Sequence, residues 1–337
     1  ENFGFWEYGY RIDTAENRDG QPKLLTGELY GKHFCIIADS MRKAAAETGA
    51  SIYIGAVTVE ASHPWDLPIA RNWNEGMMKA GHNSPDFYVV HNYFTPYNKN
   101  SSAAEILYSA ATTPGEQMRF VTKCLHDNGA AIKPIAMDEW NMFATGNGQQ
   151  VSNTSGLFAV LVMGEALRNK YGMAARWDLY NGWDNGNDHG LFSAGDEPGV
   201  ARWTPRPSFY YLYYLQRMLG DRLLGSTLTG DTSLRAYASS FSSGEIGATV
   251  VNPSPNAATI RLDIRHFKPG KQFCWYTLSG EGDGEFPRKV TVNGQTTTAA
   301  AGGPPNYATL PAYTAPTAKG ISVTIPARGA VFLVVEK

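Results

Sequence analysis

Up to about residue 220, short apolar runs alternate with amphipathic helical patterns, and this alternation limits the possible folds more than any other feature of the chain. Apolar runs predict strands at residues 51–57, 86–94, 132–141 and 175–183. Apolar residues at three- and four-residue spacing predict helices at residues 33–48, 114–128, 155–168 and 208–219. Strand–helix alternation of this kind predicts a parallel sheet wrapped by helices.

From residue 223 onward the helical period disappears and alternation of the β type replaces it between turn residues. The clearest strand candidates are residues 246–252, 258–264, 272–278, 289–292 and 321–336. Asn293-Gly294 is a typical two-residue hairpin turn. We therefore predict an antiparallel β-sandwich over residues 223–337.

The composition indicates a neutral partner. Lys and Arg number 29 and Asp and Glu 31, a formal net charge of −2, so the chain offers no basic surface for nucleic acid or an acidic membrane. It also lacks an apolar run of ~18 residues that could cross a bilayer. The 8 Trp and 18 Tyr residues suit neutral sugars, which aromatic faces bind. The three cysteines have no CxxC spacing, so one disulfide with a free thiol and a fully reduced chain both stay open.

Polar residues close the predicted strands, where a (β/α)8 barrel carries its chemistry. They are His91, Asn92 and Tyr93, then Asp138, Glu139, Trp140 and Asn141, then Asp178, Tyr180, Asn181 and Trp183. Carboxylates with Trp, and without a metal motif or a nucleophilic Ser or Cys motif, point to glycoside hydrolysis, which needs one carboxyl to protonate the leaving oxygen and a second to attack or activate water. Residues 184–190 miss the EF-hand spacing, so we predict no metal site.

Three motifs resemble one enzyme family. Residues 138–141 (DEWN), after an apolar run, are similar to the nucleophile strand of α-L-arabinofuranosidases in glycoside hydrolase clan A. Residues 1–4 (ENFG) look like the continuation of that clan's Asn-Glu acid/base motif. Residues 91–93 (HNY) resemble the His-x-Tyr at the end of the sixth barrel strand.

The resemblance implies a role for each matching residue. Glu139 would be the nucleophile, Glu1 the general acid/base, and Tyr93 the phenol that orients the nucleophile. The remaining substrate-binding candidates are Asn2, Trp6, His91, Trp140, Asn141 and Trp183. Asp138 should point to the opposite side of its strand from Glu139, so we expect it to pair with a helix. This chemistry needs no organic or metal cofactor.

The fold prediction follows from the strand count together with the resemblance. Residues 1–222 supply about four strand–helix units, whereas a closed barrel needs eight. We therefore predict that residues 1–222 are the second half of a (β/α)8 TIM barrel and residues 223–337 the β-sandwich. The missing N-terminal half would belong to the same polypeptide or to a partner chain.

The predicted activity is that of a retaining glycoside hydrolase, arabinofuranosidase-like, acting on a neutral plant or algal carbohydrate. A β-xylosidase or an agarase-type endohydrolase would use the same barrel, and a non-catalytic carbohydrate-binding protein is an alternative of another class. We expect a secreted or periplasmic protein, with a homo-oligomer possible.

Overall fold

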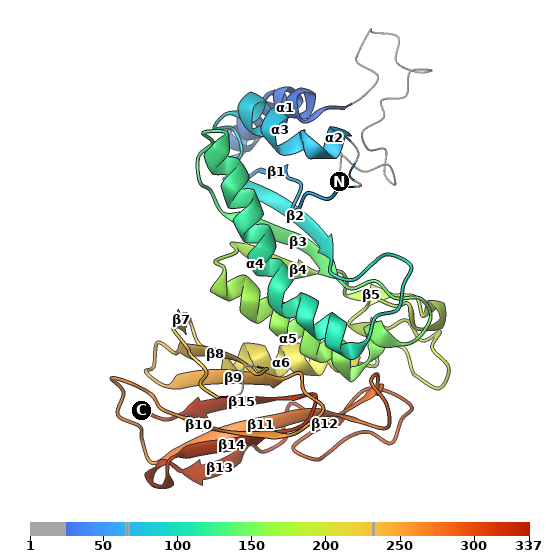
Figure 1. Ribbon diagram of the computed structural model, residues 1–337, viewed down its shortest axis with the longest axis vertical. Helices are drawn as coiled ribbons and strands as arrows, with labels where there is room; N and C mark the ends of the chain where they lie inside the picture. Colours follow the sequence, from blue (N-terminus) through green and yellow to red (C-terminus); the bar gives the residue numbers. More distant parts are fainter. Residues whose placement is uncertain (1–24, 65, 67, 231–232) are drawn as a thin grey trace. The chain divides into compact units, whose positions relative to one another are not determined.

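The computed structural model describes residues 25–64, 66, 68–230 and 233–337, which form two compact units. The first unit contains the described residues up to Asn92, together with Thr113–Trp140 and Asn169–Arg176. The second contains Tyr93–Thr112, Asn141–Arg168 and Trp177–Lys337. Figure 1 labels most of the helices and strands of both units.

The first unit is built on a four-stranded sheet in the order β1-β2-β3-β4. Its strands are β1 (Gly55–Val57), β2 (Phe87–Tyr93), β3 (Ile135–Asn141) and β4 (Met173–Arg176). β1 pairs with β2, and β3 with β4, in the parallel sense. In β3 the first three residues are buried, as expected of an apolar strand covered on both faces. A parallel arrangement places the carboxyl ends of these strands, and their polar residues, at one edge of the sheet.

Helices alternate with the strands of this part of the chain. They are α1 (Gly27–Glu47), α2 (Pro68–Arg71), α3 (Trp73–Gly81) and α4 (Ala103–Asp127). The sequence pattern did not predict α2 or α3, and α4 belongs to the first unit only from Thr113 onward. α1 and α3 lie side by side (Figure 1). α1 begins where the hydroxyl of Thr26 accepts a hydrogen bond of 3.1 Å from the backbone N–H of Leu29, which satisfies one of the free donors of the first turn.

α4 is longer than the sequence pattern predicts, because it starts at Ala103 and not near Pro114. Its first turn is a capping box. The backbone N–H of Ser102 donates to the carboxylate of Glu105 at 2.7 Å, and the N–H of Glu105 donates to the Ser102 hydroxyl at 3.2 Å. Pro114 then lies inside the helix, where it removes one backbone donor.

The second unit contains two further helices, α5 (Asn153–Arg168) and α6 (Pro207–Met218). α5 is buried along almost its whole length. Two glycines allow close packing: an added Cβ would lie 2.2 Å from the Tyr211 ring at Gly156 and 2.3 Å from the Tyr237 ring at Gly164. Short elements complete this part of the chain, namely η1 (Gln149–Val151), β5 (Tyr180–Asn181), η2 (Asp184–Gly186) and β6 (Phe192–Ser193).

The remaining strands of the second unit form two antiparallel sheets. The larger sheet has seven strands: β12 (Lys289–Val292), β11 (Gln272–Glu281), β15 (Gly329–Val335), β9 (Ile246–Asn252), β8 (Arg235–Ser240) and β7 (Arg222–Leu224) in this order, with β13 (Tyr313–Pro316) pairing with β11. The smaller sheet pairs β10 (Ala258–Leu262) with β14 (Ile321–Ile325). A short η3 helix (Thr317–Lys319) precedes β14.

The seven-stranded sheet is covered on both faces, as β15 shows. Val331 and Leu333 belong to a core shared with the β10–β14 sheet. Phe332, which points to the other face, lies 6.4 Å from the ring of Tyr211 and 6.3 Å from that of Tyr214, both on α6. Both faces of the large sheet therefore carry core side chains.

This packing divides the chain elsewhere than at residues 222 and 223. α5 and α6 fall in the same compact unit as the antiparallel sheets, although both precede residue 223. The physical reason is the apolar face of α6, which is buried against the sheet and not exposed at a boundary.

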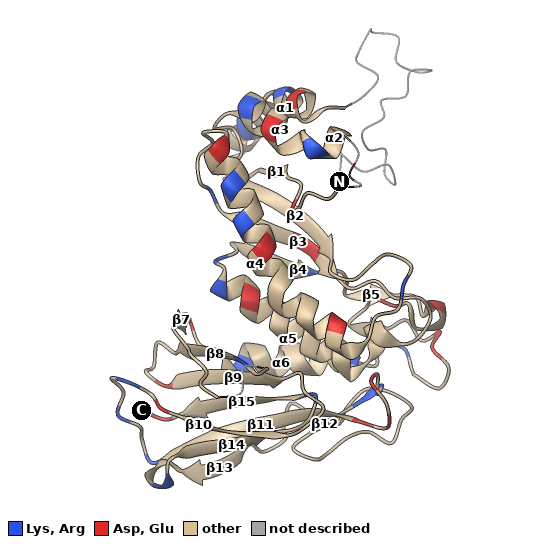
Figure 2. Cartoon of the chain, viewed as in Figure 1, with Lys and Arg blue, Asp and Glu red and all other residues tan. Residues whose placement is uncertain are grey.

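Charges are mixed along the described elements (Figure 2). α4 carries both signs along its length, including the exposed pair Lys123–Asp127, so it offers no one-sign stripe to a polyanion. No helix within the described ranges is both long and apolar enough to cross a membrane. Cys35, Cys124 and Cys274 are all free thiols, which corresponds to the fully reduced alternative.

Candidate active site

Two carboxylates and a histidine meet at the carboxyl end of the parallel sheet. Glu139 and Asp138 close β3, and His91 lies near the end of the neighbouring strand β2. His91 Nδ1 lies 4.0 Å from Glu139 Oε2, and His91 Nε2 lies 2.7 Å from Asp138 Oδ1. The Glu139 side chain is 22% exposed, so its carboxylate is sheltered and still reachable by a ligand.

The position of Asp138 corrects the sequence prediction, because it pairs with His91 on a strand and not with a helix. Consecutive strand residues normally point to opposite faces. The β3–β4 register shifts between Met137 and Trp140, and such an irregularity re-aims side chains. Asp138 and Glu139 can therefore both approach one imidazole.

A third carboxylate, which the sequence reasoning missed, lies just beyond β1. Glu60 accepts a hydrogen bond of 3.0 Å from the side-chain amide of Asn92. Thr58, two residues earlier, is fixed to β2 by its hydroxyl, which donates to the carbonyl oxygen of Val89 at 2.8 Å. Burial, with the charge of Glu60 as a smaller cause, raises the pKa of Tyr171 far above its ordinary value. A carboxylate three residues past a predicted strand was the available signal.

Two predicted substrate-binding residues are buried and hold the structure together. Trp140 has no exposed surface and belongs to the core, which argues against contact between its indole and a sugar. Asn141 is also fully buried. Its amide nitrogen donates to the carbonyl oxygen of Trp177, and its side-chain oxygen accepts from the N–H of Met142 at 2.8 Å. These bonds fix the segment after β4 and leave Asn141 without an exposed group.

Tyr93, at the end of β2, is held in an aromatic cluster of the second unit. Its ring stacks on Phe143 with a centroid distance of 4.5 Å and lies 5.3 Å from the imidazole of His189. Tyr93 is only half-buried. The stacking fixes the ring plane and therefore the direction of its hydroxyl.

The indole of Trp183 contacts two arginines, Arg206 and Arg288, which both donate hydrogen bonds to a buried glutamate. The guanidinium carbons of Arg288 and Arg206 lie 5.0 and 5.7 Å from the centre of its indole, within cation–π range. Glu197, which is fully buried, accepts hydrogen bonds from both arginines, one on each carboxylate oxygen. Trp183 is thus positioned by a network within the second unit.

Asp188 completes this network from the loop between β5 and β6. Its carboxylate is fully buried, and it accepts hydrogen bonds from Arg206 and from the N–H of Gly190. Burial raises the pKa of Asp188 to about 6, although the Arg206 cation opposes this shift.

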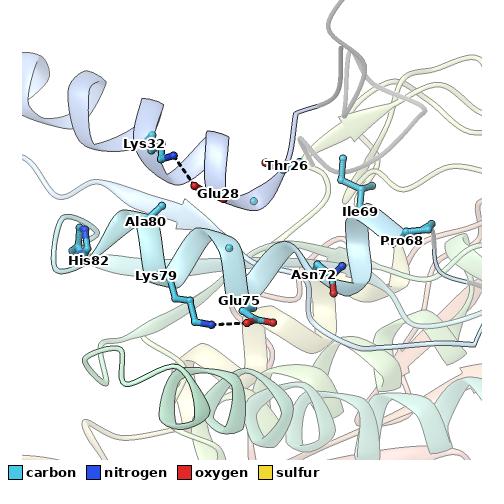
Figure 3. Close-up of a pocket in the computed structure, with 12 residues that line it drawn as sticks. Thr26, Glu28, Lys32, Pro68, Ile69, Asn72, Glu75, Lys79, Ala80 and His82 are labelled. Atoms are coloured by element: carbon cyan, nitrogen blue, oxygen red, sulfur yellow. Dashed lines mark hydrogen bonds and ion pairs between the residues drawn. The ribbon is translucent and has the colours of Figure 1, made fainter. Parts of the chain in front are cut away.

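No cluster of three or more His, Cys, Asp and Glu side chains that could hold a metal occurs among the described residues. A groove of about 840 Å³ lies between α1 and the α2–α3 segment (Figure 3). Its charges pair with one another, Lys32 with Glu28 at 2.6 Å and Lys79 with Glu75 at 2.5 Å. None of the predicted site residues lines this groove.

Glu1, Asn2 and Trp6, predicted as the acid/base and two sugar contacts, lie outside the described residues. The site assembled by the first unit therefore comprises Glu139, Asp138 and His91. The hydrogen-bonded pair of Glu60 and Asn92 lies after β1 and in β2 of the same sheet. Sheltered carboxylates at the carboxyl ends of parallel strands can donate protons or attack an electrophilic carbon.

The fold that carries this site, a parallel sheet with helices and carboxylates at its strand ends, is similar to the folds of solved glycoside hydrolases. More particularly, the fold is similar to that of solved arabinofuranosidases. No protein-family model matches the chain, and no curated protein sequence matches it.

Solved structures provide the comparison. The chain is similar to an arabinofuranosidase, with a TM-score of 0.69 and 16% identity over 100% of this chain and 65% of that one. It is also similar to a family 51 α-L-arabinofuranosidase from Bifidobacterium longum, with a TM-score of 0.60 and 14% identity over 94% and 64% of the two chains. A GH86 protein in complex with neoagarooctaose gives a TM-score of 0.63 and 10% identity over 94% and 49%. The chain thus spans less than two thirds of the length of these two arabinofuranosidases.

Proposed function

We propose that the chain is part of a retaining glycoside hydrolase, arabinofuranosidase-like, that cleaves a neutral plant or algal carbohydrate by double displacement. The observation that carries the proposal is the position of Glu139, a sheltered carboxylate at the carboxyl end of β3 with His91 at 4.0 Å. The likeness to solved glycoside hydrolases supports the fold in which such a carboxylate acts.

In this mechanism Glu139 attacks the anomeric carbon and forms a glycosyl ester, which water then hydrolyses. His91 lies beside the carboxylate, with Nδ1 at 4.0 Å, and Tyr93 has the role that the sequence resemblance gives it, orienting the nucleophile through its hydroxyl. Glu1, the acid/base of the sequence resemblance, protonates the leaving oxygen and later deprotonates the water. Retention requires the two carboxyl groups to lie about 5–5.5 Å apart.

We further propose that the four-stranded sheet is the second half of a (β/α)8 barrel, from the end of strand four to strand eight, followed by a β-sandwich. Within the described part of the chain, β1 and β4 each have one neighbour only in this sheet. Exposed apolar side chains lie beside these edges, Tyr53 just before β1 and Met173 in β4. Four further parallel strands, from the missing N-terminal half or from a partner chain, would cover both edges.

The decisive experiment is covalent labelling of the full polypeptide with cyclophellitol-type probes of arabino, xylo and galacto configuration. Mass analysis of the peptides should locate the label on Glu139, and the reactive probe would identify the sugar. Label on another residue, or no label with any probe while the fold is intact, would contradict the assignment.

Glu139→Gln should abolish turnover and leave the fold unchanged, since the amide keeps the size of the side chain but cannot form the ester. Azide should restore a product of inverted configuration. Glu116→Gln, which changes an exposed glutamate of α4, is the matched control and should keep full activity. Near-normal activity in Glu139→Gln would exclude Glu139 as the nucleophile.

An agarase-type endohydrolase is the second candidate, favoured by the similarity to the GH86 structure that holds neoagarooctaose. The galacto probe and agaro-oligosaccharides distinguish it from an arabinofuranosidase or a β-xylosidase. A non-catalytic carbohydrate-binding protein would bind oligosaccharides and take up none of the probes.

A further inference from the structure

Three side chains between β4 and α6 form an exposed cluster, all of them in the second unit. The rings of Tyr180 and Trp203 lie 4.8 Å apart at 37°. The guanidinium carbon of Arg202 lies 5.2 Å from the centre of the Trp203 ring and 5.6 Å from that of Tyr180. Arg202 also donates a hydrogen bond of 2.9 Å to the Tyr180 hydroxyl. The cluster therefore combines two ring faces with one oriented cation.

The backbone presents Trp203 at a conformational cost. The N–H of Thr204 donates to the carbonyl oxygen of Ala201 at 3.2 Å, which closes a turn with Trp203 in its third position. Trp203 has φ of +66°, a conformation that favours glycine and costs a bulky residue of order 1–2 kcal/mol. Its N–H is fixed to the carbonyl oxygen of Ser193 at 2.8 Å.

Trp203 gains little burial in return, since 55% of it is exposed. A strained residue that places a large aromatic side chain in water is not explained by stability. Such conformations are concentrated at functional sites. An exposed indole on a rigid turn is a platform for the face of a flat ligand.

The charge of Arg202 indicates what the ligand carries. No carboxylate of the described residues lies within ion-pair distance of Arg202, which is exposed. Arg206 and Arg288, by contrast, are both bound to Glu197. Arg202 uses one N–H group for the hydrogen bond to the Tyr180 hydroxyl. The other N–H groups of its planar guanidinium can bind a carboxylate or sulfate group.

We propose that Tyr180, Arg202 and Trp203 form a binding subsite for an anionic sugar unit, a uronate or a sulfated ring. The sugar face packs on the Trp203 indole, and its acidic group binds the Arg202 guanidinium. Only the choice of a carbohydrate as ligand rests on the proposed function.

The test is binding to the Glu139→Gln protein, which keeps the ligand intact. The probes are a xylo-oligosaccharide carrying glucuronate, its carboxyl-reduced form and a sulfated galacto-oligosaccharide, measured by calorimetry at low salt. We expect at least one anionic probe to bind about tenfold tighter than the carboxyl-reduced, neutral probe. Whichever anionic probe binds more tightly, the glucuronate or the sulfated one, identifies the acidic group. Arg202→Gln should abolish this preference.

Arg217→Gln is the matched control, because Arg217 makes the same kind of contact with Tyr213, a 2.6 Å hydrogen bond and a 5.4 Å ring contact, on α6. It should leave the preference unchanged. Equal binding of charged and neutral probes to the unmodified cluster, or an equal loss in both arginine variants, would overturn the proposal.

Trp203→Gly separates binding from folding. Glycine suits φ of +66°, so this variant should melt at the same temperature as the parent or higher, while it loses affinity for every probe. A variant that binds normally would refute the platform. If the protein prefers anionic probes but Glu139 is never labelled, the proposed hydrolase is refuted and the subsite is kept. If Glu139 is labelled but the protein shows no preference for anionic probes, the subsite is refuted and the hydrolase is kept.

Discussion

The buried carboxylate Glu197 offers the sharpest test of how the second unit is stabilised. Its side chain is fully buried, and it accepts hydrogen bonds from Arg206, which is 2% exposed, and from Arg288, which is 33% exposed. Removing one member of a buried charge network leaves an uncompensated charge and costs about 3–5 kcal/mol. In Glu197→Ala, Arg206 would retain its ion pair with Asp188, and Arg288 is exposed enough to be solvated by water. We therefore expect this substitution to lower the free energy of unfolding by about 3 kcal/mol, near the lower limit of that range.

Urea unfolding followed by tryptophan fluorescence measures this cost, and Trp183 lies beside both arginines. With a slope of about 3 kcal/mol per molar, the midpoint should fall by roughly 1 M. Asp127→Ala breaks the exposed Lys123–Asp127 pair and should leave the midpoint unchanged, since exposed pairs contribute little. A midpoint in Glu197→Ala equal to that of the parent would refute the network as a source of stability.

Four further substitutions, one of them a control, have defined outcomes. Tyr93→Phe should lower kcat/KM by on the order of 10–1000-fold if its hydroxyl orients the nucleophile, and an unchanged rate with labelled Glu139 would leave Tyr93 a packing residue. Gly164→Ala should destabilise the fold by about 1–2 kcal/mol by thermal unfolding, because the new Cβ would lie 2.3 Å from the Tyr237 ring and overpacking outweighs the gain in helix propensity. Gly115→Ala, whose Cβ would meet only side-chain atoms at 3.3 Å or more, should not destabilise. The pKa of Asp188 is raised to about 6 from 3.8, so the folded state binds more protons between these values and stability should fall as pH rises from 4 to 6. Asp188→Asn should remove that slope in urea titrations, and an unchanged slope would contradict the shift.

Hydrophobic periodicity located the four parallel strands, α1 and α4, but it missed α2 and α3, and the limits of the predicted elements differ from the observed ones. The expected strand at residues 51–57 pairs only over Gly55–Val57, and the one at 175–183 over Met173–Arg176. Apolar alternation continues beyond the last ladder hydrogen bond, so the pattern alone does not show where pairing ends. Three strands of the large sheet, β7, β8 and β13, gave no clear pattern. β7 (RLL) has only three residues, β8 (RAYASS) consists largely of small side chains, and β13 (YTAP) ends at a proline.

The start of α4 was predictable from the sequence. Ser102 and Glu105 have the spacing of a capping box. This is a stronger signal for the start of a helix than Pro114, which lies twelve residues after Ser102. Proline is common in the first helical turn, and the predicted helix at residues 114–128 begins at Pro114. A helix already formed on both sides, with its neighbours buried, can tolerate the missing donor.

The candidate site was predictable in its residue types and not in its geometry. The motif identified Glu139 and His91, which lie 4.0 Å apart. The register shift that turns Asp138 toward His91 depends on the pairing of β3 with β4, a tertiary feature that no local pattern reports. The burial of Trp140 and Asn141 likewise depends on the elements packed around them. Glu60 was missed because its partner, Asn92, comes from another strand.

The aromatic face of α6 has a consequence for how this protein can be divided or recombined. Tyr211 and Tyr214 are buried against Phe332, and Tyr237 of β8 fills the space left by Gly164 in α5. Cutting the chain after residue 222 would expose these tyrosines to water and take Arg288 away from Glu197. The antiparallel sheets are therefore half of a shared core and not an exchangeable appendage. Chimaeras that graft a foreign sandwich behind α6 should fail unless they also replace the helix surface that it covers.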